Sequence, residues 1–252
     1  MARGVTRRFG GLVALDGIDL DVPSGIVQAI IGPNGSGKTT LLNALSGASH
    51  ADAGSIRIGG QEIFRLKPHR IARLGLARTF QNIRIFDNLS VLENVKVAAA
   101  CNKPTSFFDI IASNARHKQS EAEIDTVARE ALETVGLTYR ADDRATQLPY
   151  AQRRLLEIAR ALASKPNVLL LDEPAAGMNM TESMTLLDTI ARLKSRGITI
   201  LLVEHNVRLV MGISDRVTVL DFGKKIAEGA PSEIQRNPQV IEAYLGRRHR
   251  HA

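Results

Sequence analysis

One segment of the sequence has the residue types and spacing of a loop that binds phosphate groups. Residues 32–39 are Gly-Pro-Asn-Gly-Ser-Gly-Lys-Thr and match the pattern G-x-x-x-x-G-K-[ST]. Glycines let backbone N–H groups point at phosphate oxygens, and the following helix N-terminus adds the positive end of a dipole. Lys38 can reach the β- and γ-phosphates, and the Thr39 hydroxyl can ligate Mg²⁺. The motif therefore predicts a nucleoside triphosphate site, the alternative being an ordinary glycine-rich turn. The candidate binding residues are Gly32, Pro33, Asn34, Gly35, Ser36, Gly37, Lys38, Thr39 and Thr40.

Two further apolar runs end in residues that could act on a bound triphosphate. Val168–Leu171 is followed by Asp172 and Glu173. If this strand lies next to the phosphate-loop strand, Asp172 would approach the Mg²⁺ and Glu173 could orient or deprotonate the attacking water. The alternative is a surface Asp-Glu-Pro turn. His205 follows the run Thr199–Val203, where a γ-phosphate contact is plausible, although a lone histidine is usually structural or exposed.

The elements that must position these residues alternate between strands and helices. A helix is expected over Thr39–Ser46, and another over Thr181–Arg196, capped by Asn179 with Glu182 and ended by Gly197. Such alternation predicts a mostly parallel α/β sheet. The expected strands are Val27–Ile31, Ser55–Ile58, Val168–Leu171, Thr199–Val203 and Arg216–Leu220.

The middle of the chain, residues 91–163, predicts helices and no strand. Ser120 and Glu123 form a possible capping box for a helix that Gly136 would end, and Arg153–Ala163 is a second helix. Before them lies a polar stretch, residues 102–119. We therefore expect a helical subdomain inserted in an α/β frame. The apolar positions with helical spacing in the first of these helices are Ile124, Val127, Ala128, Ala131, Leu132 and Val135.

Composition excludes several classes of protein. The 252 residues include 44% hydrophobic and 23% charged residues, which argues against disorder. The apolar runs have the length of strands, far from the roughly 20 residues of a membrane-spanning helix. No secretory signal is evident, and the single Cys101 excludes an internal disulfide, so a cytoplasmic location is expected. The net charge of +7 is compatible with binding to nucleic acid, to an anionic membrane surface or to a polyphosphate. The charge alone does not distinguish among these partners.

Four more segments, together with the motifs above, make the pattern specific. They are Arg78–Gln81, Leu148–Gln152, Ala176–Asn179 and Glu204–Asn206. In order and spacing the whole chain resembles the ATP-binding subunit of ABC transporters, most closely that of the branched-chain amino acid importers. The likeness covers essentially all 252 residues and rests on phrases such as FGGLVALDGIDL, ARTFQNIRIFDNLSVLENV, LLEIARALA, LDEPAAGMN, LVEHNVRLVMGISDRVTVLDFG and NPQVIEAYLG.

The resemblance implies a P-loop NTPase fold of the RecA type. It has a mostly parallel sheet, an antiparallel β edge and an inserted α-helical subdomain. The single ATPase domain, residues 1–252, would divide into a nucleotide-binding core at 1–82 and 164–252 and a helical signature subdomain at 83–163. A basic tail would follow at 247–252, where three arginines could attract anionic lipids or be idle.

The resemblance also implies roles for residues. Phe9 would stack on adenine, the alternative being a core phenylalanine. Gln81 would sense the γ-phosphate and Mg²⁺, with Thr39 and Asp172 as the other metal-site residues. Glu173 would be the catalytic base and His205 the γ-phosphate switch. In a head-to-tail dimer, each ATP would also meet the other subunit's signature, which is Leu148, Pro149, Tyr150, Ala151 and Gln152, near a dimer-contact loop of Gly177, Met178 and Asn179.

The chain departs from the family at this signature, where the usual residues are Leu-Ser-Gly-Gly-Gln. Pro149 has neither a hydroxyl nor an N–H to offer a phosphate, and Ala151 adds a methyl group where backbone must approach the ligand. Tyr150 replaces the first glycine, and Asn179 replaces the usual Asp of the contact loop. Members of the family also have several more residues before the equivalent of Val5, so the first strand is expected to be abbreviated or the true start to lie upstream.

The implied partners are those of an importer on the cytoplasmic side of the membrane. They are a second ATPase subunit, identical or different, integral membrane permease subunits and, indirectly, a periplasmic or extracellular solute-binding protein. The segment Asn82–Asn94 would dock a permease through Ile83, Ile85, Phe86 and Leu89, unless these are ordinary core. Alternatives are the ATPase of a urea importer or a lipopolysaccharide exporter. A soluble ABC ATPase acting on nucleic acid or ribosomes is disfavoured by the single phosphate loop, so no nucleic-acid partner is expected.

Overall fold

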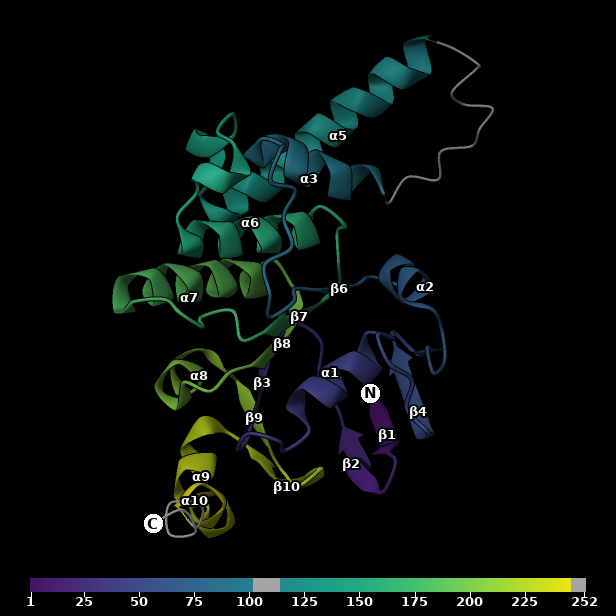
Figure 1. The fold of residues 1–252 in the computed structure, drawn as a ribbon, viewed down its shortest axis with the longest axis vertical. Helices are drawn as coiled ribbons and strands as arrows, with labels where there is room; N and C mark the ends of the chain where they lie inside the picture. Colours follow the sequence, from purple (N-terminus) through teal and green to yellow (C-terminus); the bar gives the residue numbers. More distant parts are fainter. Residues whose placement is uncertain (102–113, 246–252) are drawn as a thin grey trace. The chain divides into compact units, whose positions relative to one another are not determined.

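The computed structural model describes residues 1–101 and 114–245 (Figure 1). Most of the polar stretch 102–119 and the basic tail 247–252 lie outside the described residues. The chain forms two compact units. The first unit contains residues 1–78, 167–174 and 193 onward, and the second contains residues 79–166 and 175–192. The division expected from the sequence, at 82/83 and 163/164, stays a prediction.

The main sheet of the first unit has six strands in the order β10-β9-β3-β8-β7-β6. All neighbouring pairs are parallel except β10 with β9. Every residue of β3 and β8 is buried, as expected for a parallel sheet covered on both faces. Four of the strands were predicted, whereas β6 is only three residues long and gave no pattern. The strands are β3 (Val27–Ile31), β6 (Leu76–Arg78), β7 (Val168–Asp172), β8 (Thr199–Val203), β9 (Arg216–Asp221) and β10 (Lys224–Gly229).

A second sheet of the same unit is antiparallel, with the order β2-β1-β4-β5. Its strands are β1 (Ala2–Phe9), β2 (Leu12–Leu20), β4 (Ala53–Ile58) and β5 (Gln61–Glu62). Together with the antiparallel edge strand β10, it confirms the expected combination of parallel and antiparallel pairing. One buried apolar cluster includes side chains from both sheets and from helix α1 (Lys38–Leu45), so the two sheets share a core.

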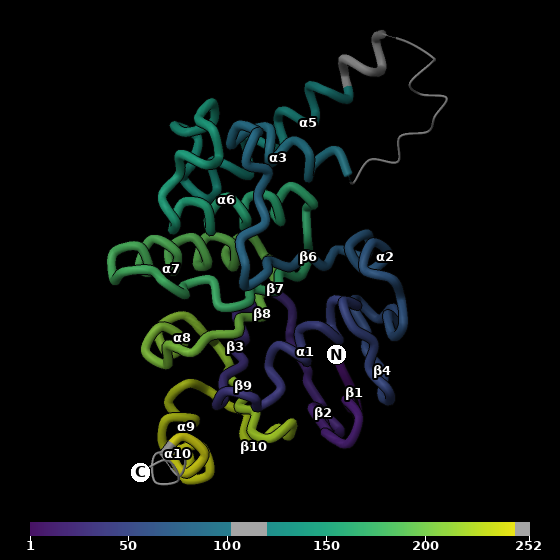
Figure 2. The backbone as a smooth tube through the Cα atoms, in the orientation of Figure 1, coloured from purple at the N-terminus to yellow at the C-terminus, as the bar shows by residue number. Residues whose placement is uncertain are grey.

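The C-terminal helices close the other face of the main sheet. In both views α9 (Pro231–Arg236) lies beside α10 (Pro238–Leu245) (Figures 1 and 2). Ile234 of α9 and Val240 of α10 join a buried cluster with Ile31 of β3 and residues of β9, and Tyr244 packs against it. The helices α2 (Pro68–Arg73) and α8 (Val207–Ile213) complete the unit.

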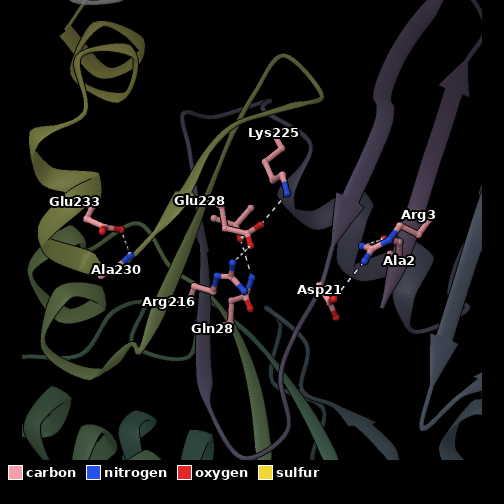
Figure 3. Close-up of polar contacts among 10 residues, drawn as sticks. Ala2, Arg3, Asp21, Gln28, Arg216, Lys225, Glu228, Ala230 and Glu233 are labelled. Atoms are coloured by element: carbon pink, nitrogen blue, oxygen red, sulfur yellow. Dashed lines mark hydrogen bonds and ion pairs between the residues drawn. The ribbon is translucent and has the colours of Figure 1, made fainter.

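Polar groups also connect the strands of this sheet. Gln28, fully buried on β3, donates from Nε2 to the Thr218 hydroxyl at 2.9 Å. Glu228 on β10 accepts from Arg216 at 2.8 Å and from Lys225 at 2.9 Å (Figure 3). Because a buried N–H group without a partner is costly, these contacts favour a single register across β3, β9 and β10.

The second unit is helical, as predicted. The described residues of 91–163 contain helices and no strand. Its elements are α3 (Val91–Ala100), α5 (Asn114–Val135), α6 (Tyr150–Leu162), two 3₁₀ turns at Thr138–Arg140 and Ala145–Gln147, and most of α7 (Met180–Ser195). None of the helices in the described part of the chain combines the length and the apolar character needed to span a bilayer.

One predicted cap is wrong and another is right. Ser120 lies inside α5, which begins at Asn114, so Ser120 and Glu123 do not form an N-terminal capping box. Helix-forming residues before Ser120 extend the helix past a residue type that favours caps but is tolerated inside. The cap of α7 is confirmed, because Asn179 Oδ1 accepts from the Glu182 N–H at 3.0 Å and Glu182 accepts from the Asn179 N–H at 2.9 Å. A capping box that was not predicted joins Ser90 and Glu93 at the start of α3.

Candidate functional site

The phosphate loop occupies the expected place, between β3 and α1 of the first unit. Gly32 must lack a side chain, because a Cβ there would lie 2.0 Å from the Leu220 carbonyl oxygen. Lys38 is buried, and its ammonium group donates to the carbonyl oxygens of Gly32 at 2.8 Å and Pro33 at 2.9 Å. The Ser36 hydroxyl lies 3.5 Å from the same nitrogen. The loop thus holds the ammonium group beside its own backbone, where phosphate oxygens could replace these acceptors.

Two later segments of the first unit support this loop. The N–H of Gly223, in the turn between β9 and β10, donates to the Ser36 carbonyl at 3.0 Å, and the Asp16 N–H of β2 donates to the Gly223 carbonyl. Burial raises the pKa of the Tyr244 hydroxyl on α10, and a hydrogen bond from the Gly32 backbone acts in the opposite direction. The C-terminal helix therefore reaches the first residue of the phosphate loop, which the sequence did not indicate.

Asp172 lies on a strand that does not pair with the phosphate-loop strand. The sequence placed Asp172 near the Mg²⁺ on the condition that its strand was adjacent to β3, and this condition is not met, because β8 lies between β3 and β7. Arg78 instead connects Asp172 to the helix α1. Its guanidinium donates to Asp172 Oδ2 at 2.9 Å, and to Asn43 Oδ1 and Ser46 Oγ of α1 at 2.8 Å each. The Arg78 and Asp172 side chains are only 5% and 3% exposed, so this fork ties the end of β7 to the helix that follows the phosphate loop.

The residues present fit a magnesium ion of the kind that accompanies nucleotides. Mg²⁺ prefers hard oxygen ligands and is usually held by one or two protein groups, the substrate phosphates and water. The Thr39 hydroxyl at the start of α1 and the buried carboxylate of Asp172 are ligands of this type. The hydrogen bond from Arg78 fixes the orientation of the Asp172 carboxylate. Among the described residues, His, Cys, Asp and Glu form no cluster of three that could hold an ion without a nucleotide.

Glu173 and His205 lie together at the carboxyl ends of β7 and β8. His205 Nε2 is 2.6 Å from Glu173 Oε1, and the histidine side chain is 45% exposed. Glu173 has a φ of +48°, which is uncommon for a residue other than glycine, and its N–H donates to the Val203 carbonyl at 2.9 Å. Backbone strain of this kind is often found at functional turns. The arrangement presents a carboxylate and an imidazole side by side.

Phe9 ends β1 in the first unit and is 50% exposed, so it is not a core residue. The guanidinium carbon of Arg7 lies 4.7 Å from the centre of its ring. An exposed aromatic ring next to a cation is suited to stacking on a nucleobase.

The second unit holds the other predicted site residues. Gln81 is exposed, and its carbonyl oxygen accepts from Arg154. In the signature, Leu148 is buried, Pro149 is the N-cap of α6, and Ala151 is 7% exposed. Because its methyl group is buried, Ala151 presents little of it to a ligand.

Two signature side chains contact other parts of the second unit. Gln152 Nε2 donates to the Tyr139 hydroxyl at 3.2 Å. The ring of Tyr150 lies against the dimer-contact loop, since a Cβ added to Gly177 would be 3.3 Å from Tyr150 Cε1. Asn179 of that loop caps α7, and Met178 follows Gly177 in the turn, its N–H donating to the Ala175 carbonyl at 3.1 Å. The alteration at Tyr150 thus adds an aromatic contact between signature and loop.

The predicted docking segment is not ordinary core. Ile83, Ile85 and Leu89 are half-buried, and Phe86 is 44% exposed. The Arg160 guanidinium lies 4.8 Å from the centre of the Phe86 ring and donates to the Arg84 carbonyl. An aromatic side chain exposed beside half-buried isoleucines is the surface expected at a contact with another protein.

The structure thus gathers the predicted residues in two groups. The first unit holds the phosphate loop, Asp172, Glu173, His205 and Phe9, and the second holds Gln81, the signature and the contact loop. Sequence reasoning did not assign Arg78, Arg154 and Glu157, three buried charged groups among apolar neighbours. A charged residue inside an otherwise apolar pattern is the signal that could have found them.

Comparison with known proteins identifies the family of this chain. The ABC transporter family profile matches residues 15–176, from β2 to the loop after Glu173. The chain belongs to the ABC transporter family. A second profile, the branched-chain amino acid ATP-binding cassette transporter, matches residues 224–250, which include β10, α9 and α10. This member of the family is therefore an ATPase, and its C-terminal helices are part of what relates it to a subgroup.

Individual relatives agree with this assignment over nearly the whole chain. The chain is 45% identical to the high-affinity branched-chain amino acid transport ATP-binding protein BraF of Pseudomonas aeruginosa, with 96% of each chain covered. It is 41% identical to the corresponding protein LivG of Escherichia coli, again over 96% of each. Among solved structures, it is similar to a nucleotide-free ATP-binding cassette from an ABC transporter, with a TM-score of 0.85, 31% identity and 97% of each chain covered.

Proposed function

We propose that this ABC ATPase powers the import of branched-chain or related amino acids. The observation that carries the proposal is the 45% identity to a branched-chain amino acid transport protein over 96% of both chains. The match of the branched-chain amino acid profile to residues 224–250 also supports it, because that segment lies outside residues 15–176, which the general ABC transporter profile matches.

The first unit would bind and hydrolyse ATP. Lys38 would exchange its contacts with the Gly32 and Pro33 carbonyls for the β- and γ-phosphates. Phe9 would stack on the adenine. Thr39 and Asp172 would hold Mg²⁺, which would neutralise charge on the phosphates. Gln81 would sense this ion and the γ-phosphate during the catalytic cycle. Glu173 would take a proton from the attacking water, and His205, 2.6 Å from Glu173, would orient that carboxylate and contact the γ-phosphate.

The second unit would complete the site of another subunit. Two chains in head-to-tail arrangement would each close the signature, Leu148–Gln152, over the ATP of the other. A helix N-terminus is suited to this contact, because α6 begins at Tyr150 and its first N–H groups favour an anion. The loop Gly177–Asn179 would meet its counterpart in the dimer.

The remaining partners follow from the transport assignment. The segment 82–94, with Phe86 exposed, would dock an integral permease subunit, and a solute-binding protein would deliver the amino acid on the opposite side of the membrane. The ATPase would then be peripheral, on the cytoplasmic face. Arg247, Arg248 and Arg250 of the tail supply three of the net +7 charges and would favour an anionic leaflet.

Reconstitution tests the proposal. The chain is co-expressed with the membrane proteins and binding protein encoded beside it, and the purified complex is placed in proteoliposomes containing MgATP. We expect ATP-dependent uptake of leucine, isoleucine or valine. Uptake of urea only, export of lipopolysaccharide, or recovery of the chain with ribosomes instead of membranes would contradict amino acid import.

A further inference from the structure

A buried arginine in the second unit connects the signature to the segment that contains Gln81. Arg154, one turn after Tyr150 on α6, is 4% exposed. Its Nη1 donates to the Phe80 carbonyl at 2.8 Å, and its Nη2 donates to the Gln81 carbonyl. Its Nε and Nη2 lie 3.2 Å and 2.9 Å from the Tyr150 hydroxyl oxygen.

Glu157 completes this group from the next turn of α6. Its Oε2 accepts from Arg154 Nη1 at 3.2 Å, and its Oε1 accepts from the Arg84 backbone N–H at 2.8 Å. Burial raises the pKa of Glu157, and the Arg84 N–H and the Arg154 guanidinium act in the opposite direction. Arg154 and Glu157 of α6 thus hold the backbone both before and after Asn82 and Ile83.

All the donors of the guanidinium are used in these contacts. An arginine side chain has five N–H groups, and Arg154 makes five contacts with them, two of which go to Tyr150. The Tyr150 hydroxyl has two lone pairs, so it can accept both. A lysine could supply at most three donors and no planar fork, so it could not reproduce the arrangement.

We propose that Arg154 is a positioning residue. It makes the position of the signature, Leu148–Gln152, depend on the conformation of the segment that contains Gln81. The inference rests on the proposed function and deepens it. A displacement of residues 80–84 by a docked permease would pull directly on the Tyr150 hydroxyl through a rigid planar group. Tyr150 also lies against Gly177, so the same displacement would reach the dimer-contact loop. The tyrosine in place of the usual signature glycine is then the acceptor that makes this connection possible.

Hydrogen exchange in the isolated full-length chain, without nucleotide, tests the connection by itself. Arg154→Gln and Tyr150→Phe are compared with Arg153→Gln. Arg153 is a matched control, because it lies on the same helix but donates to the Leu148 and Thr146 carbonyls instead. We expect the amides of residues 80–86, Arg84 above all, to exchange at least about threefold faster in the first two variants, the effect of losing one net hydrogen bond. Unchanged exchange in both would overturn the proposal.

The second measurement is the ATP concentration that gives half-maximal dimerisation, in a Glu173→Gln background that prevents turnover. Arg154→Gln should raise it about tenfold and Tyr150→Phe about threefold. Arg129→Gln, at an exposed position of α5 in the same unit, should leave it unchanged. Affinity of the monomer for ATP should stay within about twofold, because the phosphate loop belongs to the first unit. An equal loss of monomer affinity would indicate general misfolding and contradict a positioning role.

Tyr150→Phe removes one oxygen atom and keeps the ring, so it guards against a variant that does not fold. Arg154→Lys should not rescue dimerisation, since the fork is lost. If the Glu173→Gln parent does not dimerise with ATP, the proposed function is at fault, and the exchange result still decides the connection between Arg154 and residues 80–84.

Discussion

Glu173 and His205 are 32 positions apart in the sequence, yet Glu173 Oε1 lies 2.6 Å from His205 Nε2. They meet because β7 and β8 are parallel neighbours whose carboxyl ends lie at the same edge of the sheet. The left-handed conformation of Glu173 turns the chain sharply after Asp172, so the two consecutive carboxylates take different surroundings. Asp172 is buried with Arg78, and Glu173 faces the histidine.

Replacing Glu173 with Gln should abolish turnover while leaving ATP binding intact. The amide keeps the shape of the side chain but cannot accept a proton, so kcat should fall at least about a hundredfold. The ATP-bound dimer should accumulate, as light scattering would detect. Glu242→Gln, an exposed position on α10, serves as the control. Hydrolysis by Glu173→Gln at the wild-type rate would remove Glu173 from the role of catalytic base.

Arg78→Ala should destabilise the protein far more than removal of an exposed arginine. The substitution leaves the carboxylate of Asp172 buried without its ion-pair partner, which typically costs about 3–5 kcal/mol. Arg57→Ala removes an ion pair with Glu62 whose side chains are 52% and 43% exposed, and should cost about 0–1 kcal/mol. Urea unfolding measures both. Similar losses for the two variants would show that the buried fork contributes no more than a surface pair.

Phe9→Ala should weaken ATP binding to the isolated chain. Loss of one stacking contact with a base costs about 1–3 kcal/mol, or about thirtyfold in Kd at the middle of that range. Phe9→Tyr should bind normally, because the ring is kept. Phe86→Ala removes another exposed ring, in the second unit, and should leave the Kd unchanged. Fluorescence titration with a labelled ATP gives the three values, and an unaffected Phe9→Ala would exclude adenine stacking.

Ala151→Gly should leave ATPase activity equal or raise it. The change restores the usual signature residue, and the methyl group that it removes is already buried. Glycine near the start of α6 would cost about 0.5–1 kcal/mol of stability at most. Steady-state turnover against ATP concentration is the measurement. A large fall in kcat would show that the alanine is an adapted feature of this signature.

Asp215→Asn should destabilise the first unit at neutral pH but not in acid. Burial raises the pKa of Asp215, but the Lys194 ammonium at 2.5 Å and the Val27 N–H together outweigh it and leave the pKa lowered. The stability from this carboxylate is therefore complete above the ordinary aspartate pKa and is lost as the pH falls through the lowered one. Since both side chains are about a third exposed, the loss at pH 7 should stay below about 1 kcal/mol.

Thermal unfolding between pH 7 and pH 3 checks this dependence. The wild type and Asp215→Asn should converge in melting temperature as the pH falls. Asp188→Asn, at an exposed position of α7, should follow the wild type throughout. A constant difference between Asp215→Asn and the wild type at every pH would show that charge is not the cause.

Local features of the sequence determined much of this protein. The phosphate loop is a contiguous motif, so the spacing of Gly32, Lys38 and Thr39 identified it without further structure. Periodicity located most of the parallel strands and, within residues 91–163, α5 and most of α6 but not α3, because burial on one face or both repeats with the period of each element. The cap at Asn179 could also be predicted from the sequence, because its partner Glu182 is only three residues away.

Only the tertiary structure decided which distant residues meet. Strand order is set by long-range pairing, so β8 could lie between β3 and β7 with no trace in any single segment. Arg78 and Arg154 were inconspicuous because an arginine is usually exposed, and only packing shows that these two are buried with partners. Local composition also misplaced the start of α5, since Ser120 favours a cap in isolation but is held inside a longer helix. The sequence by itself determined the family and the chemistry, and the packing of separated segments determined how the charged groups are held.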